Sequence, residues 1–79
     1  MEFSLHSYDG ALPVEVTIDD DNGRYMIRKS DTSGEYFNSP TELIAWVKRH
    51  LREEEFCHPH EFRVMLERMS EYELYGTYL

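Results

Sequence analysis

Several residues in the second half of the chain are of the types that bind zinc. They are His50, Cys57, His58, His60 and Glu61. A zinc site requires a thiolate and neutral imidazoles that converge at about 2 Å from the metal, each held by a second group. The spacing contains neither a C-x-x-C nor an H-E-x-x-H pattern, and Pro59 separates two of the histidines in an expected turn. We therefore predict polar turn residues beside a buried cysteine, with a His/Cys metal site as the alternative.

The acidic run from Asp19 to Asp21, followed by Asn22-Gly23, has the composition of a calcium-binding loop. Clustered carboxylates repel one another until a hard cation neutralises them. The register of the run does not fit, because a glycine at the sixth position of such a loop places Ile18 at the first ligand position and Lys29 at the twelfth. We predict a solvated hairpin turn at this position.

Nucleophilic or acid–base catalysis would have to use Cys57, a serine or one of the 4 histidines. No local signature such as G-x-S-x-G accompanies them. The glycines are isolated turn residues, so no loop is available to cradle a phosphate. A chain of 79 residues also has little material from which to build both a core and a large pocket. We predict a protein without catalytic activity, cofactor or small-molecule substrate.

The segment from Tyr25 to Ser30 resembles the arginine-bearing strand of phosphotyrosine-binding SH2 domains. The resemblance covers these six residues only. That family has a helix before the strand and a longer sheet, whereas two predicted strands come first here. No function is carried over from it. We interpret Arg28 and Lys29 as strand charges that limit edge pairing.

Composition limits the classes of protein to which the chain can belong. Its 79 residues, 41% of them apolar, predict one small folded domain over residues 1–79. With 16 acidic against 8 basic residues the net charge is −8, which disfavours direct binding to nucleic acid or to anionic membranes. A single cysteine, no signal-peptide pattern and no long apolar run predict a cytoplasmic protein that does not enter a membrane.

The first half of the chain has the twofold periodicity of β-strands, which we expect within residues 2–38. A tight turn at Asp9-Gly10 would pair Leu5 with Val14, Phe3 with Val16 and Ser7 with Leu12, and Pro13 indicates that one of these strands lies at a sheet edge. A second turn at Asn22-Gly23 would pair Ile27 with Ile18. A short fourth strand at residues 35–37 would bring Phe37 near Ile27.

The second half has helical periodicity. Ser39-Pro40-Thr41-Glu42 is a helix start, with Ser39 as N-cap and Glu42 closing a capping box. The first helix is predicted over about residues 40–53 and the second over about 59–73, joined by residues 56–58 and followed by a docked tail at 74–79. The predicted fold is α+β: a three- or four-stranded antiparallel β-meander followed by two α-helices packed on one face of the sheet.

Aromatic side chains outside the predicted core indicate an interaction surface. Tyr and Trp provide large contact areas at modest entropic cost. We predict a small acidic protein-interaction or regulatory module that binds a protein partner or self-associates as a homodimer. The predicted partner-binding residues are Trp46, His50, Tyr75 and Tyr78. Two alternatives stay open: these rings complete a small core, or the carboxylates form one continuous surface that mimics nucleic acid and inhibits a DNA-binding protein.

Overall fold

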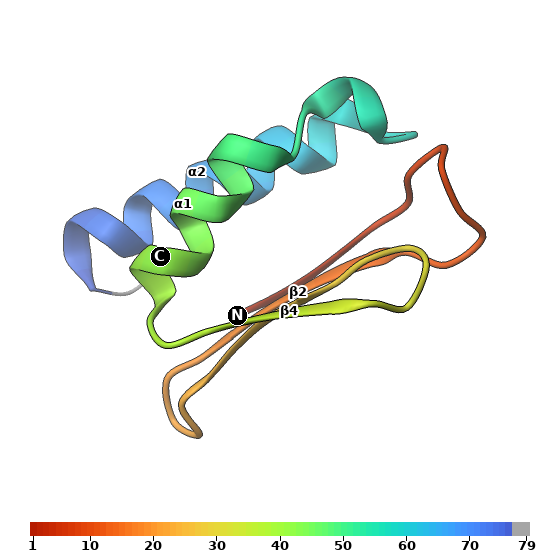
Figure 1. The fold of residues 1–79 in the computed structure, drawn as a ribbon. Helices are drawn as coiled ribbons and strands as arrows, with labels where there is room; N and C mark the ends of the chain where they lie inside the picture. The colour runs from red at the N-terminus through yellow and green to blue at the C-terminus, as the bar shows by residue number, and fades with distance from the viewer. Residues whose placement is uncertain (77–79) are drawn as a thin grey trace.

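The computed structural model describes residues 1–76 and shows a sheet covered on one face by two helices (Figure 1). The strands are β1 (Glu2–Leu5), β2 (Val14–Asp19), β3 (Arg24–Arg28) and β4 (Gly34–Phe37). They are antiparallel and lie in the order β1-β2-β3-β4. Helix α1 (Pro40–His50), a 3₁₀ turn η1 (Glu53–Glu55) and helix α2 (Pro59–Tyr75) follow. The α+β meander predicted from the sequence is confirmed.

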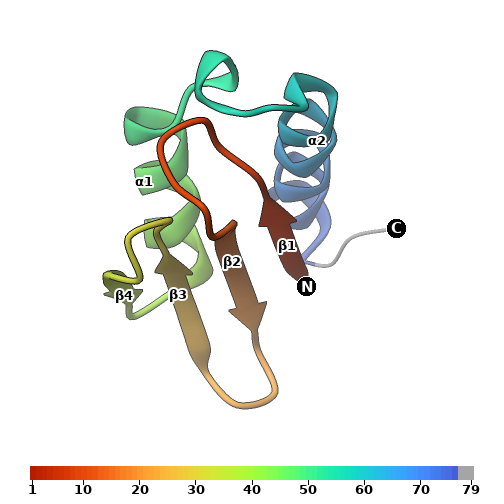
Figure 2. The ribbon, with the colours of Figure 1, turned by 90° about the vertical axis from the view of Figure 1, so that its right-hand side faces the viewer.

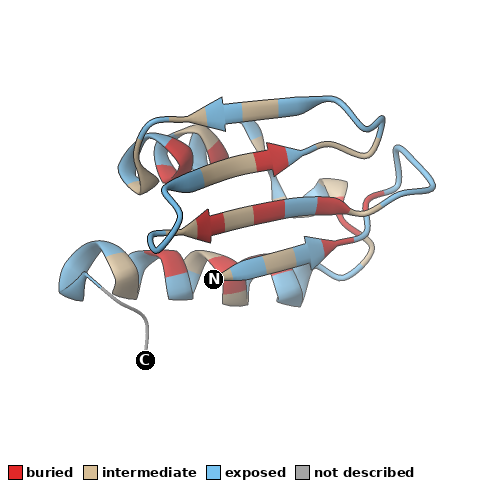
Figure 3. Ribbon diagram, turned by 90° about the horizontal axis from the view of Figure 1, so that it is seen from below, coloured by how far each residue is buried: buried red, intermediate tan, exposed pale blue. Residues whose placement is uncertain are grey.

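Alternation along the strands sends one set of side chains towards the helices. On this face Val16 and Ile27 are fully buried, and α1 and α2 each contribute three buried residues to the same core. Those helical residues are Leu43, Ile44, Val47, Phe62, Met65 and Met69. Figure 2 shows α1 on the β3–β4 side of the sheet and α2 on the β1 side. No described helix covers the opposite face of the sheet, which faces the viewer in Figure 3.

The first hairpin has the predicted register but not the predicted turn. Leu5 pairs with Val14 and Phe3 with Val16, while residues 6–13 form a wide loop. Ser7 pairs with Phe56, so its predicted pairing with Leu12 is wrong. The cause is the burial of Phe56, which is 1% exposed and stacks on Phe62 with 5.1 Å between ring centroids. This burial brings the backbone of residues 55–57 alongside the chain after β1.

The second hairpin is displaced by two residues from the predicted register. Val16 pairs with Ile27, and Ile18 pairs with Tyr25 instead of Ile27. The turn is longer than a two-residue turn because the Asp19 carboxylate accepts hydrogen bonds from the backbone N–H and the side-chain Nδ2 of Asn22, at 3.3 and 2.9 Å. A shift of two residues leaves every side chain on its predicted face.

Strand β4 is also displaced from the predicted pairing. Phe37 lies opposite Tyr25, and Glu35 lies opposite Ile27. Phe37 therefore faces the helices from the end of the strand, beneath the start of α1.

Both helices start at the predicted prolines, but Glu42 bonds to Asn38 and not to Ser39, so the predicted capping box is incomplete, and both helix ends differ from the prediction. Ser39 Oγ accepts the Glu42 N–H at 3.2 Å, and Glu42 Oε2 accepts the Asn38 N–H at 3.1 Å. Helix α1 ends at His50, and the glutamates 53–55 form the separate turn η1, because negative charge is unfavourable at a helix C-terminus. Helix α2 continues to Tyr75, where Gly76 caps it in the left-handed region at φ 74°.

These differences correct two predictions about the connections. Phe56, predicted in a turn, belongs to the core. Tyr75, predicted in the tail, is the last residue of α2, and residues 77–79 lie outside the described part of the chain. Within residues 1–76, neither helix combines the length and apolarity needed to cross a bilayer.

Candidate interaction surface

Helix α1 carries Trp46 on the flank that faces β4. The indole is half-buried, because Trp46 lies beside the buried stripe of α1 and not within it. Its ring centroid is 6.1 Å from that of Phe37 and 4.6 Å from that of His50, one helical turn further on. Three rings from α1 and β4 are thus in contact, and the imidazole of His50 is exposed.

A lysine completes this group. Lys29 follows β3, and its Nζ lies 5.5 Å from the Trp46 ring centroid, within the range of a cation–π interaction. The same Nζ is 3.2 Å from Glu35 Oε1 on β4. The indole is therefore held by a helix turn, a strand and a paired cation. We call Lys29, Phe37, Trp46 and His50 the Trp46 cluster.

A hollow of about 450 Å³ lies beside the Trp46 cluster. Its walls come from the loop after β1, the loop after β3, the end of α1 and η1. Trp46, Leu51 and Phe56 supply apolar surface, and Lys29 together with three carboxylates supplies both signs of charge. The sequence did not predict a hollow of this size in so short a chain. Its lining of apolar and charged groups suits contact with a side chain of a partner.

Ser7 also lines the hollow. Its residue is 8% exposed, and its Oγ is buried without a hydrogen-bond partner among the described residues. The pairing of Ser7 with Phe56 places it there.

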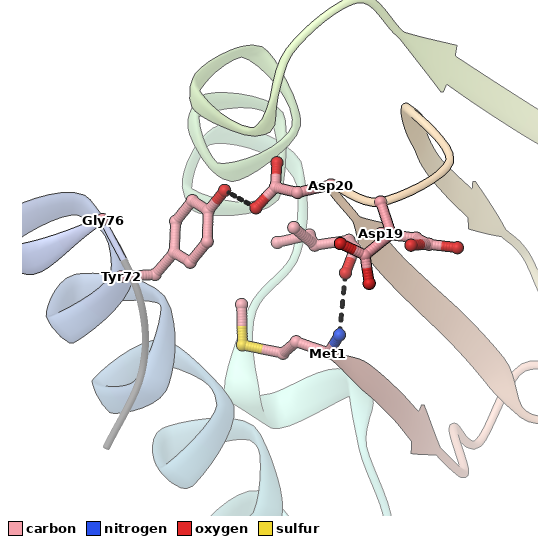
Figure 4. A pocket seen from close by; sticks show the side chains of 7 residues that line it. Met1, Asp19, Asp20, Tyr72 and Gly76 are labelled. Atoms are coloured by element: carbon pink, nitrogen blue, oxygen red, sulfur yellow. Dashed lines mark hydrogen bonds between the residues drawn. The ribbon is translucent and has the colours of Figure 1, made fainter.

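A second cluster joins the turn after β2 to the last turns of α2 (Figure 4). Asp20 accepts hydrogen bonds from the hydroxyl of Tyr25, at 2.6 Å, and from the hydroxyl of Tyr72. These bonds lower the pKa of Asp20, with the Tyr25 bond as the larger cause. Partial burial, followed by the bond to Asp20, raises the pKa of Tyr72 to about 12. The Met1 amine donates to the Ile18 carbonyl at 2.7 Å on the same side. We interpret this cluster as a structural tie.

Three of the four predicted partner-binding residues lie within the described part of the chain, and two of these three are in contact. Trp46 and His50 are in ring contact. Tyr75 lies at the end of α2, 66% exposed, and is not among the residues that line the hollow. Tyr78 lies outside the described residues. The structure thus brings Trp46 and His50 together and leaves Tyr75 apart from them.

Within residues 1–76, no three His, Cys, Asp or Glu side chains are placed to hold one metal ion. His58 and His60 are exposed. Cys57 is half-buried and unbonded to another cysteine, so the prediction that it is buried is wrong.

Within residues 1–76, basic side chains lie among the carboxylates. These side chains form four ion pairs with N···O distances between 3.1 and 3.9 Å. They are Arg28–Glu15, Lys29–Glu35, Lys48–Glu73 and Arg63–Glu53. A mimic of nucleic acid needs acids in an uninterrupted row, and this arrangement does not favour one.

Sequence reasoning missed Lys29 as part of the site, although a signal for it exists. Tyr25 and Ile27 face the helices, so a twofold period continued by one step places Lys29 on the same side. The contribution of Phe56 to the hollow was also missed, and no local pattern reveals it. Comparisons with models of protein families, with curated protein sequences and with solved structures found no match for this chain.

Proposed function

We propose that this protein is a small non-catalytic interaction module of the cytoplasm, and that it binds a protein through the Trp46 cluster and the hollow beside it. The observation that carries the proposal is the half-buried indole of Trp46, fixed between Phe37, His50 and Lys29 at the edge of a hollow. The free Cys57 is consistent with a reducing compartment.

The geometry supports binding for energetic reasons. An indole already held by neighbouring groups loses little conformational entropy when a partner covers it. Tryptophan is enriched among the residues that dominate interface energies, especially beside pockets from which water is excluded. The surrounding charges of both signs would orient a partner.

The test is capture of partners from native lysate on the immobilised full chain. We expect a protein that is retained by the wild type and lost with Trp46→Ala. Tyr75→Ala is the matched control, because it removes an aromatic ring that is 66% exposed and lies on α2. His50→Ala provides a second, milder change in the cluster, since His50 is exposed and its loss should leave the core intact.

Circular dichroism of each variant separates loss of binding from loss of folding. Equal capture by folded Trp46→Ala, folded His50→Ala and wild type would contradict the proposed surface. Loss of capture with Tyr75→Ala alone would move the surface to the end of α2.

A further inference from the structure

Strand β4 has an open hydrogen-bonding edge. The Lys29 N–H donates to the Ser33 carbonyl at 2.7 Å, so residues 33, 35 and 37 direct their backbone groups towards β3. By alternation, Gly34 and Tyr36 direct their N–H and C=O groups away from the sheet. Strand β4 is the last in the sheet order, and no segment within residues 1–76 pairs with this side.

The other edge of the sheet is partly closed. Beyond β1, the Cys57 N–H donates to the His6 carbonyl at 2.9 Å and the Tyr8 N–H donates to the Glu55 carbonyl at 3.0 Å. Figure 3 shows α2 behind β1 and reaching past it, whereas α1 lies behind β3 and β4 without reaching past β4. Neither α1 nor α2 would therefore obstruct a strand that pairs with the free edge of β4.

The flank of α1 above this edge carries charges that would be complementary between two copies related by a twofold axis. Glu42, Trp46 and Arg49 follow at helical spacing on the β4 side of α1, with His50 beside Arg49. Glu42, Arg49 and His50 are exposed. If two such helices run antiparallel about a twofold axis near Trp46, Glu42 of each copy meets Arg49 and His50 of the other. The opposite flank carries Lys48, which is paired with Glu73 of α2.

We infer that the occupant of this surface is a second copy of the chain, with the two β4 strands antiparallel across a twofold axis and the two α1 flanks facing each other over the seam. This inference rests on the proposed function and names the partner. The half-buried Trp46 rings then lie between the helices, and Tyr36, 75% exposed, lies on the other face of the joined sheet. An inward carboxylate on an edge strand normally opposes pairing, but Glu35 is already paired with Lys29 at 3.2 Å.

The test measures the mass of the full chain by sedimentation equilibrium at concentrations up to about 1 mM, which covers weak association. We expect the wild type to dimerise with increasing concentration. Tyr36→Pro removes an outward N–H without touching the β3–β4 ladder, so it should give a folded monomer. Tyr36→Ala keeps that N–H and should retain the dimer, which separates backbone pairing from side-chain contact.

Charge variants test the helix flank independently. Arg49→Gln and Lys48→Gln change the net charge equally, but only Arg49→Gln should weaken the dimer, by about tenfold in Kd for the loss of close charge pairs. Circular dichroism confirms the fold of each variant. A wild type that stays monomeric, or a dimer that folded Tyr36→Pro leaves unchanged, overturns the inference.

The two proposals fail in different ways. A monomer that still captures a lysate protein through Trp46 disproves the second copy as occupant and leaves the proposed function standing. A monomer whose capture is absent or independent of Trp46 disproves both.

Discussion

Tyr72→Phe tests whether the Asp20 cluster ties the turn after β2 to helix α2. The substitution removes one hydroxyl and leaves the ring in place, while Asp20 keeps its bond from Tyr25 at 2.6 Å. A hydrogen bond to a charged group contributes about 1.5–3 kcal/mol when shielded from water. Asp20 is exposed, so we expect about 1 kcal/mol after allowing for solvent. In a domain of this size that is a fall in Tm of about 4–8 °C at pH 7.

The pH dependence gives a second measure, which reports the burial of Tyr72 together with its bond to Asp20. The pKa of Tyr72 is raised to about 12 in the folded protein. Because the folded value lies above the unfolded one, the stabilisation is complete below about pH 10 and is lost as the pH rises towards 12. This rise in the pKa of Tyr72 corresponds to at most about 2.7 kcal/mol, which we reduce to about 1 kcal/mol because the hydroxyl is near solvent. The pKa of Asp20 is lowered, so its contribution is lost in acid, as the pH falls below about 4 through the folded value.

Urea unfolding at pH 7, 10 and 12 measures the loss of stability caused by Tyr72→Phe and its dependence on alkaline pH. The wild type should lose about 1 kcal/mol more than Tyr72→Phe between pH 10 and 12. Tyr75→Phe is the matched control, since Tyr75 lies on the same helix and is 66% exposed. Parallel pH profiles for the wild type and Tyr72→Phe, or additive effects of Tyr72→Phe and Asp20→Asn in a double-mutant cycle, would refute the reasoning.

Three further substitutions test the packing and the caps. Phe56→Ala should cost about 3–5 kcal/mol and abolish the folded circular dichroism signal, because Phe56 is 1% exposed; a native-like spectrum would contradict its place in the core. Gly10→Ala places a Cβ 2.7 Å from Ser30 Cβ and should cost about 1–3 kcal/mol in urea unfolding, with Ser30→Gly restoring part of the loss; no loss would mean that the two loops are not in contact. Ser39→Ala should cost about 1 kcal/mol through the lost N-cap, and an equal effect of Thr41→Ala would argue against the cap.

The parts of the fold that were predictable are those encoded by neighbouring residues. Val14, Val16 and Ile18 alternate, and every one of them is buried. Ser39 Oγ accepts the Glu42 N–H three residues further on, as the predicted N-cap requires. The predicted pairing of Leu5 with Val14 also holds, because the apolar faces of the two arms fix the register.

The parts that were not predictable depend on contacts between distant residues or on the detail of one side chain. The loop at residues 6–13 replaces a tight turn because Phe56 is buried far along the chain. The second turn is longer because Asp19 bonds to Asn22. For the candidate surface, Trp46 and His50 are one helical turn apart and could be paired from sequence, whereas Phe37 joins them only through the position of α1 over β4.

The pairing of residues 6–8 with residues 55–57 has a consequence for the order in which the chain acquires its structure. The first strand is flanked on one side by its immediate successor and, just past its end, by a segment from between the helices. Contacts of such long sequence separation slow folding, because the chain between them must be ordered first. During synthesis, residues 6–8 can form these contacts only after residues 55–57 have been made. Strand β1 should therefore be among the last elements to gain protection against amide hydrogen exchange.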